Sequence, residues 1–387
     1  MPLNPNSGMS DNLGIYYLVY LNVLVCVLYS PFIQEIGVLH ILSALLTTIM
    51  TFLFVIRVAL TSRIGIYHAI LILSLFYYVF IAALNVFGGI SVNEVIRAYI
   101  SFIYLPVFAA LVSLLDEKEL KSILKLLFLI SFISALLVFP FFVELALGML
   151  NYSRYTAHLG IIHTPILLIG IPLSYYLKIN RISITSVFLI AIFATQSKGQ
   201  ILIGLAGLAV CVLSKVDSKL FKVSFIAAFI LFFSGVLFLF QDTLLKRFTD
   251  ISGSTSMHRV QEIVIAFNYF YKNPVLGAGP TAKFSIENEG TESDEQNYVH
   301  NVIMYLLALS GFVGLMIYLT PYVISLRASV SDENAYLIKI AIVSSFLYLL
   351  IAATFKSIQT NIFIGVLLGA CFKVNQLKNR QLIEKKA

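Results

Sequence analysis

Charge is scarce in this sequence. Aspartate, glutamate, lysine and arginine together make up 12% of the 387 residues, which is about half of their share in an ordinary soluble domain. Apolar residues make up 59%, and the mean hydropathy is +0.94. These values exclude an ordinary soluble fold, and the long apolar runs favour membrane-spanning helices over the short alternating strands of a β-barrel.

Cysteine and tryptophan are also rare. The three cysteines, Cys26, Cys211 and Cys371, lie in separate apolar runs and have neither the spacing of a metal site nor a paired pattern. We therefore expect small buried apolar side chains rather than disulfides or metal ligands. Tryptophan is absent, so the 21 tyrosines are expected to supply the aromatic side chains at the membrane–water interfaces.

The apolar runs predict an all-α polytopic membrane protein. A helix rises 1.5 Å per residue, so about 20 residues cross a hydrocarbon core of ~30 Å. About 12 transmembrane helices are expected, at residues 14–30, 37–56, 64–86, 94–115, 122–146, 159–177, 183–196, 199–213, 223–240, 300–323, 336–354 and 358–373. Their connections are short except for one large polar loop, 241–299.

The distribution of basic residues predicts the orientation of the chain. Most of the 26 lysines and arginines fall in connections on the same side as both termini. Because cytoplasmic loops are enriched in these residues, we expect both termini, including a short tail at 374–387, to be cytoplasmic. The loop 241–299 is then periplasmic, and residues 1–387 form a single domain in the bacterial inner membrane.

Two of the expected spans are short. Helices over 183–196 and 199–213 would not cover a ~30 Å hydrocarbon core at 1.5 Å per residue. Their junction, 195–199, is therefore expected below the outer surface. Lys198 at that depth is costly unless it lines a wet cavity or meets an anion, although its side chain could also extend outward to water.

The large loop contains a predicted helix. Residues 254–256 offer N-cap side chains for a helix over about 257–271, whose apolar residues recur on one face. This pattern is typical of a helix that lies in the membrane interface. It ends at Asn273-Pro274, and the turn-rich segment 277–280 follows, in which glycines let the backbone approach a ligand.

A histidine and three cations lie on the outward side in this arrangement. His300, at the end of the loop, can accept a proton near neutral pH, and Asn301 beside it can hydrogen-bond a sugar or a carbonyl group. Arg154, Lys198 and Arg259 suit a diphosphate, because arginine binds phosphate oxygens in pairs and lysine acts as a point charge. Taken singly, each is more often an ordinary surface or headgroup-binding residue.

Four segments follow one another in the order of a known family. In chain order they are Arg154 with Pro165; Ser197-Lys198-Gly199; Ser256-Met257-His258-Arg259 followed by Asn273-Pro274-Val275-Leu276-Gly277-Ala278-Gly279; and His300-Asn301 followed, after a gap of nine residues, by Gly311-Phe312-Val313-Gly314. Over about residues 150–325 the chain resembles the O-antigen polymerase and O-antigen ligase superfamily of bacterial polysaccharide assembly. Lys198 stands where this family usually has arginine, and Ala157 or His158 where it tends to have glycine.

The resemblance implies a glycosyltransferase of the integral-membrane, GT-C-like kind, without a metal or other cofactor. Its donor would be an undecaprenyl-diphosphate-linked oligosaccharide, used on the periplasmic face. His300 would act as the general base on the acceptor hydroxyl, with Arg259 as the second catalytic residue. Arg259, Arg154 and Lys198 would bind the lipid diphosphate.

The resemblance also implies glycan contacts and partners. The glycan would be bound by Asn301, Gly277, Gly279 and His158. The protein would work among membrane lipids, with a chain-length regulator and a flippase as further partners, and without nucleic acid.

Three functions remain open at this point. A polymerase would pass the glycan to another lipid-linked repeat unit, whereas a ligase would pass it to the lipid A core, and both would use the same donor. The divergence of the chain outside its motifs favours the polymerase. A transporter or flippase for lipid-linked glycans, the alternative of another class, would carry ionisable residues near the middle of its spans, where this chain has almost none.

Overall fold

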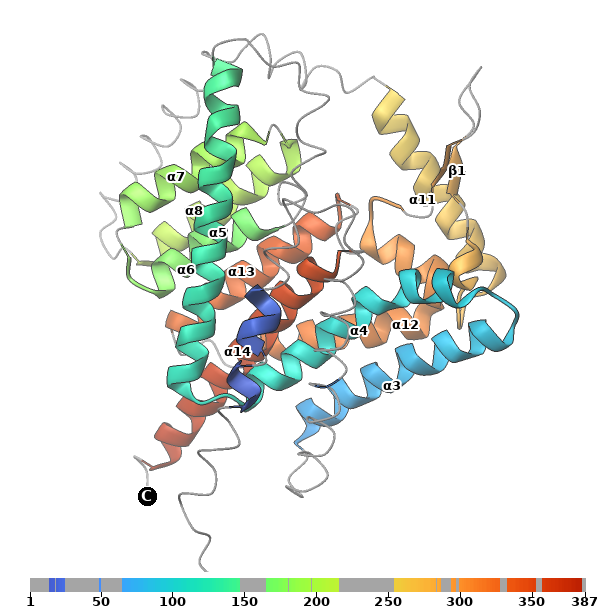
Figure 1. The fold of residues 1–387 in the computed structure, drawn as a ribbon, viewed down its shortest axis with the longest axis horizontal. Coiled ribbons are helices and arrows are strands. Elements are labelled where there is room, and N and C mark those ends of the chain that lie inside the picture. Colours follow the sequence, from blue (N-terminus) through green and yellow to red (C-terminus); the bar gives the residue numbers. More distant parts are fainter. Residues whose placement is uncertain are drawn as a thin grey trace, which may run out of the picture.

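The computed structural model of the chain describes residues 14–17, 19–24, 49, 65–146, 165–179, 181–195, 197–215, 254–282, 284–286, 294–296, 299–327, 333–352 and 357–384. Nearly all of these residues lie in helices (Figure 1). The main helices are α3 (Ile66–Phe87), α4 (Val92–Leu114), α5 (Glu117–Ala146), α6 (Ile166–Tyr176), α7 (Arg181–Ala194), α8 (Lys198–Lys215), α11 (Ser254–Lys272), α12 (Val302–Arg327), α13 (Glu333–Leu349) and α14 (Ile358–Glu384).

The helical membrane architecture expected from composition is confirmed in its broad form. Within the described residues, five helices are long and apolar enough to cross a membrane, namely α3, α4, α5, α12 and α14. Five shorter apolar helices, at Gly14–Leu24 and within α6, α7, α8 and α13, fall on other expected spans. The spans expected at 37–56 and 223–240 lie almost wholly outside the described residues, so the total of twelve stays a prediction.

The helices form two groups that α13 and α14 connect (Figure 1). In one group α5 packs against α6 and α7, and α8 packs against α6. In the other, α3 packs against α4 and α12, and α11 packs along α12. Because α13 contacts α6 and α8 while α14 crosses α4, this central pair joins the two groups into one body.

The crossing of α14 over α4 depends on two glycines four residues apart. A Cβ atom on Gly365 would lie 2.7 Å from the carbonyl oxygen of Leu105, and one on Gly369 would lie 2.5 Å from that of Ala109. Glycines at this spacing let two membrane helices approach until their backbones touch, which maximises van der Waals contact. The sequence therefore allows a helix contact here that any larger residue would separate.

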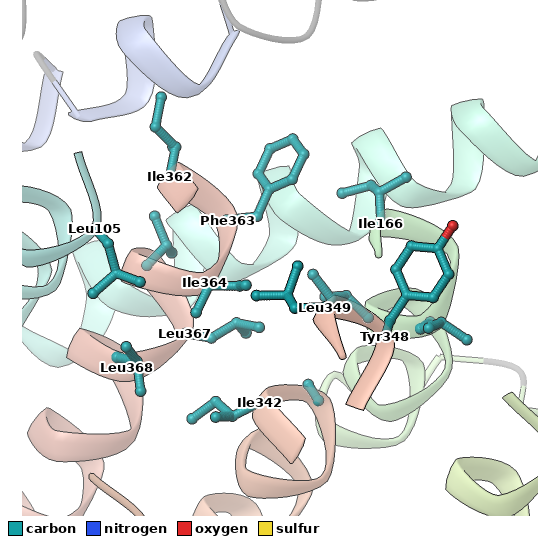
Figure 2. Close-up of a cluster of buried hydrophobic side chains, with 14 of the residues drawn as sticks. Leu105, Ile166, Ile342, Tyr348, Leu349, Ile362, Phe363, Ile364, Leu367 and Leu368 are labelled. Carbon is teal, nitrogen blue, oxygen red and sulfur yellow. The ribbon is translucent and has the colours of Figure 1, made fainter. Parts of the chain in front are cut away.

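Apolar side chains from four helices fill the space beside this crossing (Figure 2). Leu105 of α4, Ile166 of α6, Leu349 of α13 and Ile364 of α14 are each at most 1% exposed. Lipid tails are as apolar as these side chains, so their burial stabilises the fold mainly through close packing. This cluster holds the end of α13 in place, next to Leu350, the residue that Asn301 contacts.

Helix α12 is broken near its middle. At Gly311 φ is +64° and ψ is −166°, a conformation that is essentially restricted to glycine. The segment after α11 fills the break, because the Ala278 amide donates to the carbonyl of Ala308 at 2.7 Å and the Phe312 amide donates to that of Pro274 at 2.9 Å. Backbone groups released inside a membrane need such partners within the protein.

Two tyrosines satisfy further carbonyl groups next to this break. The hydroxyl of Tyr77, on α3, donates to the carbonyl of Ser310 at 2.8 Å. The hydroxyl of Tyr99, on α4, donates to that of Leu309 at 3.3 Å. Helices α3, α4 and α12 and the segment after α11 are thus joined at one level of the bundle.

The structure has a helix, α11, where the sequence predicts one over about 257–271. Its apolar face is exposed, with Val260, Val264 and Phe267 each at least half exposed. The segment just after its C-terminal end is held beside Phe312, about 15 Å along α12 from Val302 at 1.5 Å per residue. The location of α11 in the membrane interface stays a prediction.

One short β-hairpin departs from the all-α expectation. Strands β1 (Phe284–Ile286) and β2 (Asp294–Gln296) pair antiparallel, just after a 3-10 turn at Gly279–Thr281. Phe284 is 1% exposed, and its ring contacts those of Tyr269 and Tyr305. This aromatic anchor fixes the strand against α11 and α12, an effect that a polar loop sequence does not reveal.

The expected tail at 374–387 is helical as far as Glu384 and continues α14. Residues 374–384 contain neither glycine nor proline, so nothing in the sequence ends the helix at the membrane boundary. Asn375 also packs inward, with its side-chain amide donating to the carbonyl of Cys371 at 2.8 Å. The cytoplasmic location of this tail stays a prediction.

Candidate functional site

The candidate site is built around His300, at the start of α12. Glu262 of α11 accepts two kinds of hydrogen bond from it: the His300 backbone N–H lies 2.9 Å from Oε2, and ring Nδ1 lies 3.0 Å from both carboxylate oxygens. The Glu262 side chain is 3% exposed and the His300 side chain 33% exposed. A buried carboxylate thus holds a histidine whose ring reaches solvent.

The helical period of α11 explains why Glu262 faces inward. Val260, Ile263 and Val264 lie on the exposed apolar face, whereas Glu262 and Ala266 are four residues apart on the opposite face and are buried. Helix α11 packs along α12, and Glu262 on this second face bonds His300, just before the start of α12. The packing of α11 on α12 therefore also brings the Glu262 carboxylate to His300.

The environment of Glu262 favours its ionised form. Burial alone would raise the pKa of this carboxyl group. The hydrogen bonds from the ring and backbone N–H of His300, together with the positive charges of His300 and Arg259, outweigh burial and hold the pKa of Glu262 below its usual value. Because an ionised carboxylate only accepts hydrogen bonds, Nδ1 must carry a proton, and in a neutral ring the lone pair is then on Nε2.

Asn301 fixes the backbone next to His300. Its side-chain oxygen accepts from the amides of Ile303 and Met304 at 3.0 and 3.1 Å, which makes it the N-cap of α12. Its side-chain amide donates to the carbonyl of Leu350 at 3.1 Å, just after α13. In this structure the side chain that the sequence assigns to glycan binding holds two helix ends together.

The junction between α7 and α8 lies against the same end of α13. Ser197 caps α8 by accepting from the amide of Gln200 at 3.4 Å, and Lys198 is the first residue of that helix. A Cβ atom on Gly199 would collide with the side chain of Ile351, the residue after the one that Asn301 binds. The backbone of Lys198 is therefore close to the start of α12, as a shared site requires.

The two glycines assigned to glycan binding face protein. At Gly277 φ is +73°, and a Cβ atom would lie 2.5 Å from the carbonyl carbon of Leu309. At Gly279 φ is +72°, and a Cβ atom would collide with the side-chain oxygen of Asn85. Both glycines thus pack the segment after α11 onto α12 and α3, and a glycan contact through their backbone stays a prediction.

The cations expected at the site divide into three cases. Arg259 is exposed on α11, three residues before Glu262, and its charge acts on that carboxylate. The structure places only the backbone of Lys198, while Arg154 and His158 lie outside the described residues.

In the part of the chain that the structure describes, no group of three or more histidine, cysteine, aspartate or glutamate side chains could hold a metal ion.

Glu262 is the site residue that reasoning from the sequence missed. It is the only acidic residue in α11, and it lies three residues after Arg259, away from the apolar stripe. Those two facts were signals of an inward-facing polar group. What the sequence could not supply is its partner, since Glu262 and His300 are 38 residues apart.

The fold and the site define a helical membrane protein with a histidine–carboxylate pair between a polar loop helix and a spanning helix. The O-antigen ligase family model matches residues 183–319, which include Lys198, Arg259, Glu262 and His300. This match confirms the resemblance that the motifs indicate, to the O-antigen ligase and polymerase superfamily. No curated protein sequence matches the chain.

Proposed function

We propose that the protein is an integral-membrane glycosyltransferase that acts on glycans carried by undecaprenyl diphosphate. The observation that carries this proposal is the Glu262–His300 pair beside Arg259, inside the segment that matches the O-antigen ligase family. A membrane family of this description implies glycan transfer. The donor carrier, the direction of transfer and metal independence are parts of the proposal.

The residues fit the chemistry of transfer to a hydroxyl group. The acceptor oxygen attacks the anomeric carbon of the donor sugar while the bond from that carbon to the diphosphate oxygen breaks. His300 takes the hydroxyl proton at Nε2 as the general base, and the diphosphate leaves with the bonding electron pair. Arg259 stabilises its negative charge, assisted by Lys198 and Arg154.

The surroundings of Arg259 support a lipid-linked donor. The helix that carries it exposes Val260, Val264 and Phe267, which suits contact with lipid tails. The arginine lies one helical turn above Glu262 along α11, toward the end of the spanning helix where a headgroup would lie. A donor with an apolar chain and a diphosphate could contact the apolar face of α11 with its chain and Arg259 with its diphosphate.

The proposal includes the finer architecture expected from the sequence. We propose about twelve spans in a GT-C-like arrangement, cytoplasmic termini and a periplasmic loop at 241–299, in the bacterial inner membrane. The acceptor and donor would then meet in the periplasm, where lipid-linked repeat units are assembled into polymer. A chain-length regulator and a flippase are the proposed partners.

We favour the polymerase over the ligase within this family. The sequence diverges outside its motifs, which suits an enzyme adapted to one repeat unit. The ligase is the second candidate, because the matching family carries that description. In both cases the catalytic step at His300 is the same and only the acceptor differs.

The lipopolysaccharide ladder of a strain that lacks this gene tests the proposal, run beside its parent and a complemented strain. A single band of core plus one repeat unit identifies the polymerase. Core alone, with long polymer accumulating on the lipid carrier, identifies the ligase. Core alone without polymer on the carrier indicates a flippase, and an unchanged ladder contradicts all three.

A further inference from the structure

We propose that Glu262 is the positioning residue of the general base: it fixes the ring of His300 and stabilises the positive charge that the ring gains during transfer. This inference rests on the proposed function, because it gives a role to a residue that acts through His300. Glu262 itself need not touch the glycan. Its part is to set which ring nitrogen faces the acceptor.

The contacts of Glu262 fix both the backbone and the ring of His300. One carboxylate accepts from the His300 amide at 2.9 Å and from Nδ1 at 3.0 Å. Two bonds to the same residue restrain the side-chain torsions more tightly than one would. With Nδ1 as the donor, Nε2 is the nitrogen that can accept a proton.

The burial of Glu262 makes its charge effective. Its side chain is 3% exposed, against 33% for His300, so little water screens the carboxylate. When His300 takes a proton it becomes an imidazolium ion beside a carboxylate, an arrangement that lowers the energy of the charged state. A neutral side chain at position 262 would keep the packing without this stabilisation.

Helix α11 connects this pair to the proposed diphosphate site. Arg259 and Glu262 lie three residues apart on the same helix and interact electrostatically. The charge of Arg259 acts on Glu262, while Tyr305 lies one turn into α12. The contact between Glu262 and His300 therefore also fixes the position of Arg259 relative to the general base.

The test uses the purified full chain in proteoliposomes, with lipid-linked repeat units extracted from the deletion strain as donor and acceptor. Transfer rates are measured from about pH 5 to about pH 8, the range in which histidine titrates. The variants are Glu262→Gln, Glu262→Asp and His300→Ala. Glu117→Gln, an exposed acid at the start of α5, is the matched control for loss of one carboxylate.

We expect Glu262→Gln to lower the maximal rate about ten- to hundredfold. The acidic limb of its pH profile should move to lower pH, because the ring loses the negative charge that favours its protonation. Glu262→Asp keeps the charge, so its acidic limb should stay near that of the parent while the rate falls. Glu117→Gln should change neither the rate nor the profile.

A second readout does not depend on activity. In protein labelled with ¹⁵N-histidine, the His300 signal, assigned by its loss in His300→Ala, should report a protonated Nδ1 and an unprotonated Nε2 near neutral pH. Glu262→Gln should mix the two neutral forms, because a carboxamide can either accept from Nδ1 or donate to it. The Glu262→Asp spectrum should keep the parental form.

Distinct results overturn the inference and the proposed function. A Glu262→Gln rate or acidic limb equal to that of the parent removes Glu262 from positioning, and so does a His300 signal that does not change. Full transfer by His300→Ala instead removes the general base, and the proposed mechanism falls with it.

Discussion

At the scale of single residues, the candidate site depends on one contact, between Glu262 and His300. His300 alone at a membrane surface could be an ordinary hydrogen-bonded side chain. Held by a buried carboxylate at 3.0 Å, it has a defined proton position and a defined orientation. The structure thereby supports His300 as the candidate base.

Removal of the base or of its neighbouring cation should stop transfer. General-base catalysis contributes about 10²–10⁴-fold to a rate, so His300→Ala should lose at least about a hundredfold. Arg259→Ala should lose transfer through weaker stabilisation of the leaving diphosphate. Both variants should remain in the membrane at parental levels, because the two side chains are partly or fully exposed; normal long-chain polysaccharide from either variant would contradict its assigned role.

Lys198 offers a test of charge against geometry. If it meets a diphosphate, Lys198→Arg should keep transfer, because the charge remains and the family usually has arginine there. Lys198→Ala should then lose most of it. The comparison is made by the polysaccharide ladder of complemented deletion strains, and equal ladders from both variants would indicate a side chain that only extends to water.

At the scale of secondary structure, the break in α12 organises the region below the site. The segment after α11 enters this break and occupies its backbone groups, while Tyr77 and Tyr99 bind the neighbouring carbonyls. Helix α11 is consequently held at two places. Near its middle it is held through Glu262, and after its end through the segment that contains Gly277.

Gly311→Ala should destabilise the protein. The conformation at φ +64° and ψ −166° costs a non-glycine residue about 1–3 kcal/mol, and the added Cβ would also collide with the carbonyl oxygen of Val275. Thermal unfolding of the detergent-solubilised protein should show a lower midpoint than the parent. Gly14→Ala is the control, since a Cβ there meets nothing within 4 Å, and equal midpoints for Gly311→Ala and the parent would show that the break is not strained.

At the scale of the whole molecule, α13 and α14 determine where the site can form. They join the helix group that contains the α7–α8 junction to the group that contains α11 and α12. Asn301 and Gly199 reach successive residues, Leu350 and Ile351, at the end of α13. Parts of one candidate site are thus drawn from both groups and from segments more than a hundred residues apart.

The proposed orientation predicts opposite labelling of the loop and the tail. Gln261→Cys, at an exposed position of α11 near Arg259, should react with a membrane-impermeant maleimide in cells whose outer membrane alone has been permeabilised. Ala387→Cys should react only after the inner membrane is opened. The background replaces Cys26, Cys211 and Cys371 by serine, and the reverse pattern would place the loop in the cytoplasm.

Much of the fold could be predicted because composition and periodicity are local properties. The scarcity of charge predicted membrane helices, and the described spans lie where the apolar runs indicated. The period of the residues near Val260 and Val264 predicted a helix in the loop, which α11 confirms. The hairpin at Phe284 was not predicted, because an aromatic anchor in a polar segment shows no period.

The sequence by itself determined that the chain crosses a membrane as helices, and it identified His300 and Arg259 as candidate residues through their motifs. Only the tertiary structure decided that Glu262 holds His300, that the glycines near Gly277 pack against α12, and that Asn301 joins two helix ends. The reason is physical: hydropathy and helical period act between neighbours along the chain. A pair such as Glu262 and His300 exists only once α11 has packed on α12.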